Sequence, residues 1–160
     1  MNANEYSQML AASPLGAELT DSEREALAAV MGSEQVPAGK VLVREGEDRR
    51  TLFVLAEGRL NVCKNVGGQE ETVYQMRVGE CAGTRAFIDG SARKAALCSE
   101  TDSWVLTLEP DDFESLLETH PNVVYRVMRA IFRITHTNLM RVNLESAEMR
   151  NYLMKSGGRY

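Results

Sequence analysis

Glycine spacing is the feature that most restricts the fold of this 160-residue chain. Eight of the twelve glycines fall between Gly39 and Gly90, and short apolar stretches separate them. Residues 52–56 form a continuous apolar run, and residues 74–78 alternate between apolar and polar. Short segments of period two between turn residues are typical of antiparallel strands. The middle of the chain is therefore predicted to form an antiparallel β-roll or jelly-roll barrel.

The two ends of the chain have helical patterns. Thr20 with Glu23 three residues later forms a capping box, and Gly32 is expected to end that helix. Pro110 is predicted to begin a short helix, and a longer pattern without glycine or proline runs over residues 122–149. The predicted fold class is α+β: a β-roll flanked by an N-terminal helix and by C-terminal short and long helices.

These patterns suggest an order of segments along the chain. Residues 1–18 are interpreted as an N-terminal extension and residues 19–120 as the β-roll with its flanking helices. Residues 121–154 form the long helix, and residues 155–160, which include a glycine pair, are expected to be a loose tail.

The long helix carries two apolar stripes. Val124, Val127, Ile131 and Ile134 lie on one, which can pack on the β-roll. The second has the heptad-like spacing of a helix seam. Both could form one broad buried stripe in a monomer, but the second is better explained by a homodimer, because the helix outruns the β-roll beyond Leu139. The predicted dimer interface is Tyr125, Met128, Phe132, Thr135, Leu139 and Val142, with Met149 continuing the spacing.

The overall charge and the cysteines restrict location and partners. Eighteen basic and 23 acidic residues give a net charge of -5, which disfavours nonspecific binding to nucleic acids or anionic membranes. The three cysteines, Cys63, Cys81 and Cys98, are far apart in sequence, as in proteins of a reducing compartment. No secretory signal or membrane-spanning run is discernible. We predict a cytoplasmic protein without nucleic-acid or membrane partners.

Enzyme signatures are weak in this sequence. The two histidines both lie in the helical C-terminal end, so no His and carboxylate cluster suggests a metal. No Ser-His-Asp set, phosphate loop or dinucleotide fingerprint is found. We therefore expect no catalytic residues, metal or cofactor, and a β-barrel enzyme is the third choice.

One segment has the features of an anion site. Gly79 and Gly83 precede a short helical stretch over residues 84–88, and a turn follows before Arg93, which is expected to open the next strand. A helix start offers free backbone N–H groups to an anion, and an arginine can grip the same anion with two hydrogen bonds. Arg85 and Lys94 add positive charge; either could instead be a solvated surface residue, and Arg93 could pair with an acidic neighbour.

From these residues the chain resembles the cyclic nucleotide-binding domain family, which includes bacterial catabolite activator proteins and kinase regulatory subunits. The resemblance covers about residues 13–145. The spacing from Thr84 to Arg93 matches the family's phosphate-binding cassette without a gap. Further matches are Leu19-Thr20, Pro37 to Gly39, Val41 to Gly46, Leu52 to Gly58, Asp102 to Glu109 and Asp112-Phe113.

The resemblance implies a pocket for a cyclic nucleotide, cyclic AMP or cyclic GMP. Where the family has a glutamate for the ribose hydroxyl, this chain has Thr84, and Glu80 falls at the wrong place and is expected to face elsewhere. Cyclic nucleotide binding is therefore expected to be weak. As alternatives to ligand contact, Thr84 could serve as the cap of the helix, and Asn138 could set the register of a dimer. The candidate ligand residues are Gly83, Thr84, Arg85, Ala86, Arg93, Lys94 and Asn138.

Two functions remain open at this point. The chain could be a sensor that binds a cyclic nucleotide or another phosphorylated ligand and signals through helix movement to a separate effector protein. It could instead be a ligand-independent dimeric interaction module whose pocket has decayed. Transcription-factor relatives carry a helix-turn-helix after the long helix, and the sequence ends at Tyr160 without room for one, so we expect no direct DNA binding.

Overall fold

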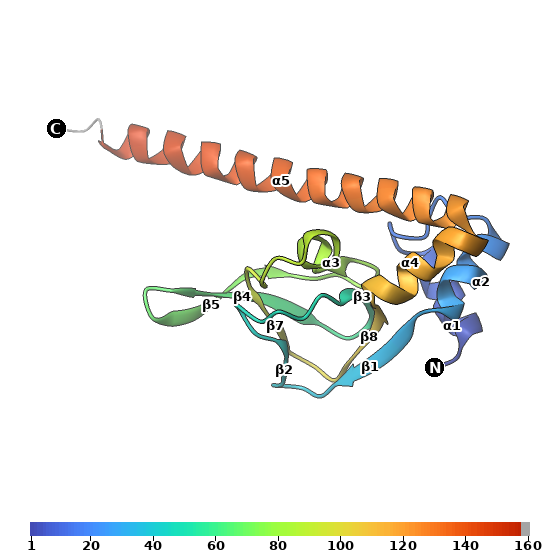
Figure 1. Ribbon diagram of the computed structural model, residues 1–160. Coiled ribbons are helices and arrows are strands. Elements are labelled where there is room, and N and C mark those ends of the chain that lie inside the picture. Colours follow the sequence, from blue (N-terminus) through green and yellow to red (C-terminus); the bar gives the residue numbers. More distant parts are fainter. Residues whose placement is uncertain (158–160) are drawn as a thin grey trace.

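The computed structural model describes residues 1–157 and shows a β-roll with helices at one end and along one side (Figure 1). The strands are β1 (Gly32–Val36), β2 (Val41–Val43), β3 (Leu52–Glu57), β4 (Leu60–Val66), β5 (Gln69–Gln75), β6 (Cys81–Ala82), β7 (Ala96–Ser99) and β8 (Ser103–Leu108). The helices are α1 (Ala3–Ala11), α2 (Asp21–Ala29), α3 (Thr84–Asp89), α4 (Pro110–Thr119) and α5 (Pro121–Gly157).

The strands form two four-stranded sheets in the orders β1-β8-β3-β6 and β2-β7-β4-β5. Every pair described is antiparallel. Apolar residues from both sheets, among them Phe53, Leu60, Leu97 and Val105, meet in a buried cluster inside the roll. The predicted fold class, an α+β chain with an antiparallel β-roll, is confirmed.

A second core lies between the roll and the helices at its end. Leu10 of α1, Leu27 of α2, Leu106 of β8, Phe113 of α4 and Val127 of α5 belong to this one cluster. Figure 1 shows the four helices gathered at the same end of the roll. The start of α5 is therefore packed into the body of the domain.

The N-terminal region contains two helices where the sequence had predicted one. The additional helix α1 lies inside the stretch interpreted as an extension, and Asn2 with Glu5 forms its capping box. The Tyr6 hydroxyl donates to Ser33 Oγ at 2.8 Å, which ties α1 to β1. Residues 1–18 thus contribute to the core, and their Asn2–Glu5 spacing is a cap signal that the sequence carries.

Two predicted boundaries were wrong. Helix α2 begins after Thr20 as predicted, but it ends at Ala29 with Val30 as its cap, and Gly32 is the first residue of β1. A side chain at Gly32 would crowd Thr107 of the paired strand, so the glycine allows close strand packing. Strand β5 ends at Gln75, so Met76 and Val78 lie outside a strand, although the N–H of Met76 still donates to the Leu60 carbonyl at 2.8 Å.

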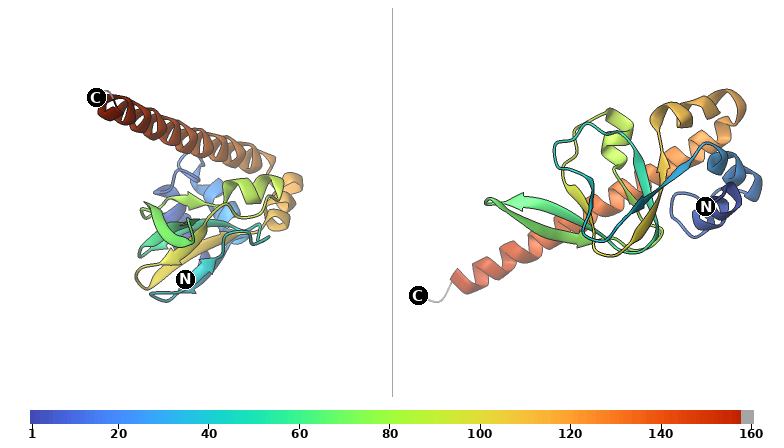
Figure 2. Two further views of the ribbon diagram at one scale, coloured as in Figure 1. Left: turned by 90° about the vertical axis from the view of Figure 1, so that its left-hand side faces the viewer. Right: turned by 90° about the horizontal axis from the view of Figure 1, so that it is seen from below.

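Helix α5 is longer than predicted and spans 37 residues. It runs through Gly157, three residues into the expected tail, while residues 158–160 lie outside the described residues. Figures 1 and 2 show it passing α3 and the β4–β5 hairpin. Within residues 1–157, no helix combines the length and apolar character needed to cross a membrane.

Candidate ligand-binding site

The glycine-led segment forms a short helix bounded by two left-handed glycines. Strand β6 leads into Gly83, whose φ is +87°, and α3 then spans Thr84 to Asp89. Gly90, with φ +72°, ends the helix, and its N–H bonds to the Ala86 carbonyl at 3.0 Å. Both glycines adopt a backbone that other residues rarely reach, which explains why the helix can be this short. The first N–H groups of α3 have no partner within a helix.

Arg93 lies beside this helix start, but it does not open a strand as predicted. It sits in the loop before β7, where its backbone N–H bonds to the Glu47 carbonyl and its carbonyl accepts from Gly46 N–H. The backbone of Arg93 therefore pairs with the β2–β3 loop, and β7 begins only after it. The side chain is only 6% exposed, and its Nε donates to the Arg49 carbonyl at 2.8 Å. Its Nη2 donates to the Thr51 carbonyl.

The guanidinium of Arg93 is held by neutral carbonyls and an aromatic ring. It lies 5.2 Å from the ring centre of Phe53. No carboxylate within residues 1–157 forms an ion pair with it, whereas the neighbouring Arg49 pairs with Glu34 at 2.7 Å. Burial lowers the pKa of Arg93, and the nearby Arg49 charge adds to this, yet arginine stays protonated in proteins. The site is thus a buried cation that has no ion-pair partner in the described part of the chain.

A cavity of about 950 Å³ opens in front of this cation, between the roll, α3 and α5. All seven predicted ligand residues line it. Ala86 is buried, Arg85 is exposed and pairs with Asp89 at 3.6 Å, and Lys94 is exposed. Asn138 reaches the cavity from α5. The structure thus brings these residues together, and their roles in binding stay predictions.

Thr84 is the contact point between the cassette and α5. Its Oγ accepts a hydrogen bond from the Thr135 hydroxyl at 3.3 Å. Thr135 had been predicted for the dimer seam, and Val142 of the same seam also lines the cavity. These two residues therefore lie where the seam approaches the site. All six predicted seam residues are exposed: Tyr125, Met128, Phe132, Thr135, Leu139 and Val142.

Among the cavity residues that the sequence analysis missed, three are linked through Tyr74. Glu80 had been expected to face elsewhere, but it lines the cavity, where it accepts from the Tyr74 hydroxyl at 2.7 Å. The Arg141 guanidinium lies 4.0 Å from the centre of the Tyr74 ring. Burial and the Glu80 hydrogen bond raise the pKa of Tyr74. The contacts of Tyr74 with Glu80 and Arg141 depend on strand pairing and on the course of α5, so no local sequence motif predicts them.

Comparison with known proteins agrees with this arrangement. The sequence-family model of the cyclic nucleotide-binding domain matches residues 33–120, which are more than half of the chain. A cAMP-dependent protein kinase regulatory subunit from Aspergillus niger is 29% identical over 121 residues, which cover 76% of this chain and 29% of that protein. The chain spans about a third or less of the curated relatives that head the comparison.

Three solved structures share the fold. A cyclic nucleotide-binding domain from Methylobacillus flagellatus has a TM-score of 0.77 at 20% identity, covering 87% of this chain and 79% of its own. The catabolite activator protein of Thermus thermophilus has a TM-score of 0.71 at 24% identity, covering 84% and 63%. The regulatory subunit of a cAMP-independent protein kinase A from Trypanosoma brucei has a TM-score of 0.72 at 23% identity, covering 84% and 46%. With the cassette and the match over residues 33–120, the chain belongs to the cyclic nucleotide-binding domain family.

Proposed function

We propose that this chain is a non-enzymatic regulatory sensor domain that binds a cyclic nucleotide, or another phosphorylated small ligand, in the cavity. The observation that carries the proposal is the state of Arg93, which is buried and held by carbonyls and has no ion-pair partner among residues 1–157. A buried charge without a counter-ion is costly, so an anion that reaches it is bound with a favourable charge-assisted hydrogen bond. The free N–H groups at the start of α3 add donors to the same place.

Signal transfer would run from the cassette to α5. A ligand held by Arg93 and α3 occupies a cavity whose other wall includes Ile134 and Asn138 of α5. The Thr84–Thr135 hydrogen bond already joins the two elements. A ligand that prefers one position of α5 over another shifts the population toward that position. The moving helix would then alter a surface read by a separate effector protein.

The exposed seam on α5 supports a homodimer as the functional unit. Phe132 is 72% exposed and Leu139 is 57% exposed, and the heptad spacing places both on one line of the helix. A second copy is the partner that matches these exposed apolar residues, whereas Thr135 and Val142 of the seam lie toward α3 and the cavity. We further propose a cytoplasmic location, without direct contact to nucleic acid or membrane, on the basis of the acidic net charge and free cysteines.

A second candidate function is a ligand-independent dimeric interaction module. It is favoured by Thr84 at the family's glutamate position and by Arg85, which is paired with Asp89. The Trypanosoma brucei structure is that of the regulatory subunit of a cAMP-independent protein kinase A, so this fold also occurs in a subunit whose kinase does not depend on cyclic AMP. In this alternative the cavity has no physiological ligand.

Calorimetric titration of the full chain with cyclic AMP, cyclic GMP and cyclic dinucleotides separates the two functions. Under the sensor proposal at least one ligand binds, and Arg93→Ala and Arg93→Lys both lose that binding, since lysine lacks the planar fork. The matched control is Arg44→Ala, because Arg44 is exposed and does not line the cavity. Circular dichroism confirms that each variant is folded. If folded wild type binds none of these up to about millimolar concentration, the interaction module is favoured.

A further inference from the structure

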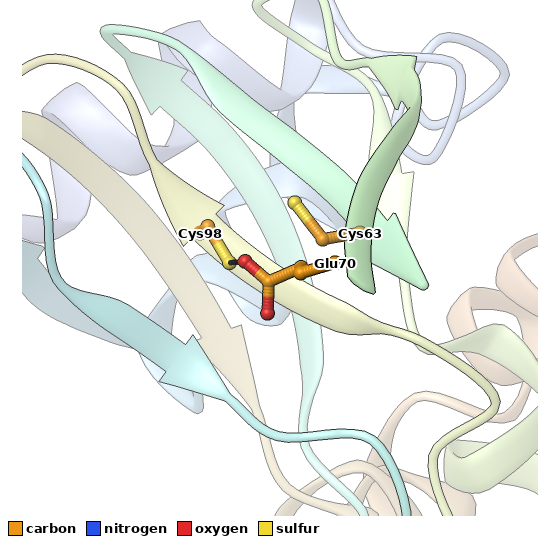
Figure 3. Close-up of side chains that lie close together, drawn as sticks. All are labelled: Cys63, Glu70 and Cys98. Atoms are coloured by element: carbon orange, nitrogen blue, oxygen red, sulfur yellow. Dashed lines mark hydrogen bonds between the residues drawn. The ribbon is translucent and has the colours of Figure 1, made fainter. Parts of the chain in front are cut away.

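Two cysteines that are 35 positions apart in sequence meet on the sheet β2-β7-β4-β5. Cys63 of β4 and Cys98 of β7 lie beside Glu70 of β5 (Figure 3). The two sulfur atoms and a carboxylate oxygen all lie within 4.8 Å of one another. The Cys98 thiol donates to Glu70 Oε1 at 3.6 Å. Three groups that bind metals as anions thus converge from three adjacent strands.

The register of the strands explains why they meet. Cys63 is opposite Ala96, and Cys98 is opposite Asn61, so the two cysteines are diagonal neighbours on one face of the β4–β7 pair. Cys63 is also opposite Thr72, which places Glu70 on the adjoining diagonal. Backbone ladders on both sides hold β4 and β7, and one ladder holds β5 at the edge of the sheet. The ligand atoms are therefore presented by rigid elements, as a metal site requires.

Diagonal placement favours a shared ion over a disulfide. Diagonal residues of an antiparallel pair lie about 7–8 Å apart, whereas a disulfide needs Cα atoms about 4.4–6.8 Å apart. A tetrahedral zinc ion with Zn–S bonds of about 2.3 Å tolerates a wider separation, because the ion stands between the two sulfurs. The pair can thus be bridged by an ion without moving the strands.

We propose that Cys63, Cys98 and Glu70 bind a zinc ion. Two thiolates and one carboxylate suit zinc, whereas magnesium and calcium prefer oxygen ligands alone and copper(I) prefers sulfur alone. Three protein ligands leave the fourth position to water or to a partner side chain. The site lies apart from the ligand cavity, since the cavity residues Val62 and Leu97 alternate with the two cysteines along β4 and β7.

The proposed site also links zinc binding to the stability of the domain. An ion that joins β7, β4 and β5 binds the folded state alone, so it raises the melting temperature of the domain.

The test uses the full chain, reduced and stripped with EDTA, titrated with zinc by calorimetry and with cobalt(II) by absorption. We expect one ion per chain and a thiolate-to-cobalt charge-transfer band. Cys63→Ala and Cys98→Ala each remove both signals, and Glu70→Gln weakens zinc binding by about tenfold or more. The matched controls are Cys81→Ala, whose thiol lies outside the cluster, and Glu71→Gln, whose side chain points to the other face of β5. Neither control changes the binding.

Two results overturn the proposal. The first is the absence of saturable zinc binding by folded, fully reduced protein at about 100 μM zinc, where even micromolar affinity saturates. The second is zinc binding that Cys98→Ala and Cys81→Ala change equally, because the ion would then sit elsewhere. If the protein forms a Cys63–Cys98 disulfide in air but binds no zinc once it is reduced, the proposal is overturned, because this too is an absence of zinc binding by reduced protein.

Discussion

The guanidinium of Arg93 occupies the space that a side chain on Gly83 would need, so its Nη1 atom packs directly over the bare Cα of Gly83. A Cβ atom at Gly83 would also lie 3.0 Å from the carbonyl oxygen of Thr51, which accepts a hydrogen bond from Arg93. The glycine before α3 therefore serves two needs. It adopts the left-handed backbone that starts the helix, and it lets the buried cation reach the cassette.

Gly83→Ala is expected to destabilise the domain more than Gly39→Ala. Both glycines have a left-handed backbone, with φ of +87° and +78°, which costs an alanine about 1–3 kcal/mol. A side chain at Gly39 meets nothing within 4 Å, whereas one at Gly83 overlaps Arg93. Urea unfolding measures both losses. Equal losses would show that Arg93 moves away without cost and that the packing over Gly83 is unimportant.

Local signals predicted most of the fold because the patterns that mark its strands and helices each span only a few residues. The run at 52–56 became β3, Pro110 and Pro121 each begin a helix, and Thr20 caps α2. The errors lie at boundaries that tertiary contacts decide. Gly32 belongs to β1 because it packs against Thr107, which is 75 positions away in sequence.

The candidate site was predictable where its residues share one local motif, and the distant Asn138 was placed there only by the family resemblance. Residues 83–86 and Arg93 were found from one motif, and the structure places them along one cavity. Glu80 and Tyr74 were not, because their contact depends on how β5 turns toward β6. The contact between Cys63 and Cys98 depends on strand register, which the cysteine spacing does not encode.

Thr84→Glu is expected to strengthen cyclic AMP binding by about tenfold or more. Thr84 lines the cavity, and a carboxylate there can accept hydrogen bonds from a ribose, each worth about 1.5–3 kcal/mol when one partner is charged. The matched control is Ile88→Glu, which adds the same charge to α3 at an exposed position outside the cavity. Calorimetry compares the two variants. A gain in neither, or an equal gain in both, contradicts a ribose contact at this position.

The free energy of unfolding is expected to fall between about pH 9 and pH 12, partly through Cys81. Burial raises the pKa of the Cys81 thiol from its ordinary 9.0 to about 12. Because the folded state holds this proton more tightly, the contribution is complete below pH 9 and is lost as the pH rises through 12. Cys98 titrates in the same window. Cys81→Ala should flatten the profile in urea unfolding at several pH values, and superimposable profiles would contradict a buried thiol here.

The last prediction concerns the seam on α5. Phe132 and Leu139 are exposed on one chain, and a homodimer would bury both against their counterparts. Wild type at micromolar concentration should therefore scatter light as twice the chain mass, and Phe132→Glu combined with Leu139→Glu should scatter as one chain, because four carboxylates would face one another in the seam. The melting temperature of the β-roll should change little, since neither residue belongs to its buried clusters. Leu144→Glu is the control: it is 62% exposed on α5 but lies off the heptad spacing, so it should leave the mass unchanged. A monomeric wild type, or a dimer that survives the double substitution, would remove the seam from the proposed function.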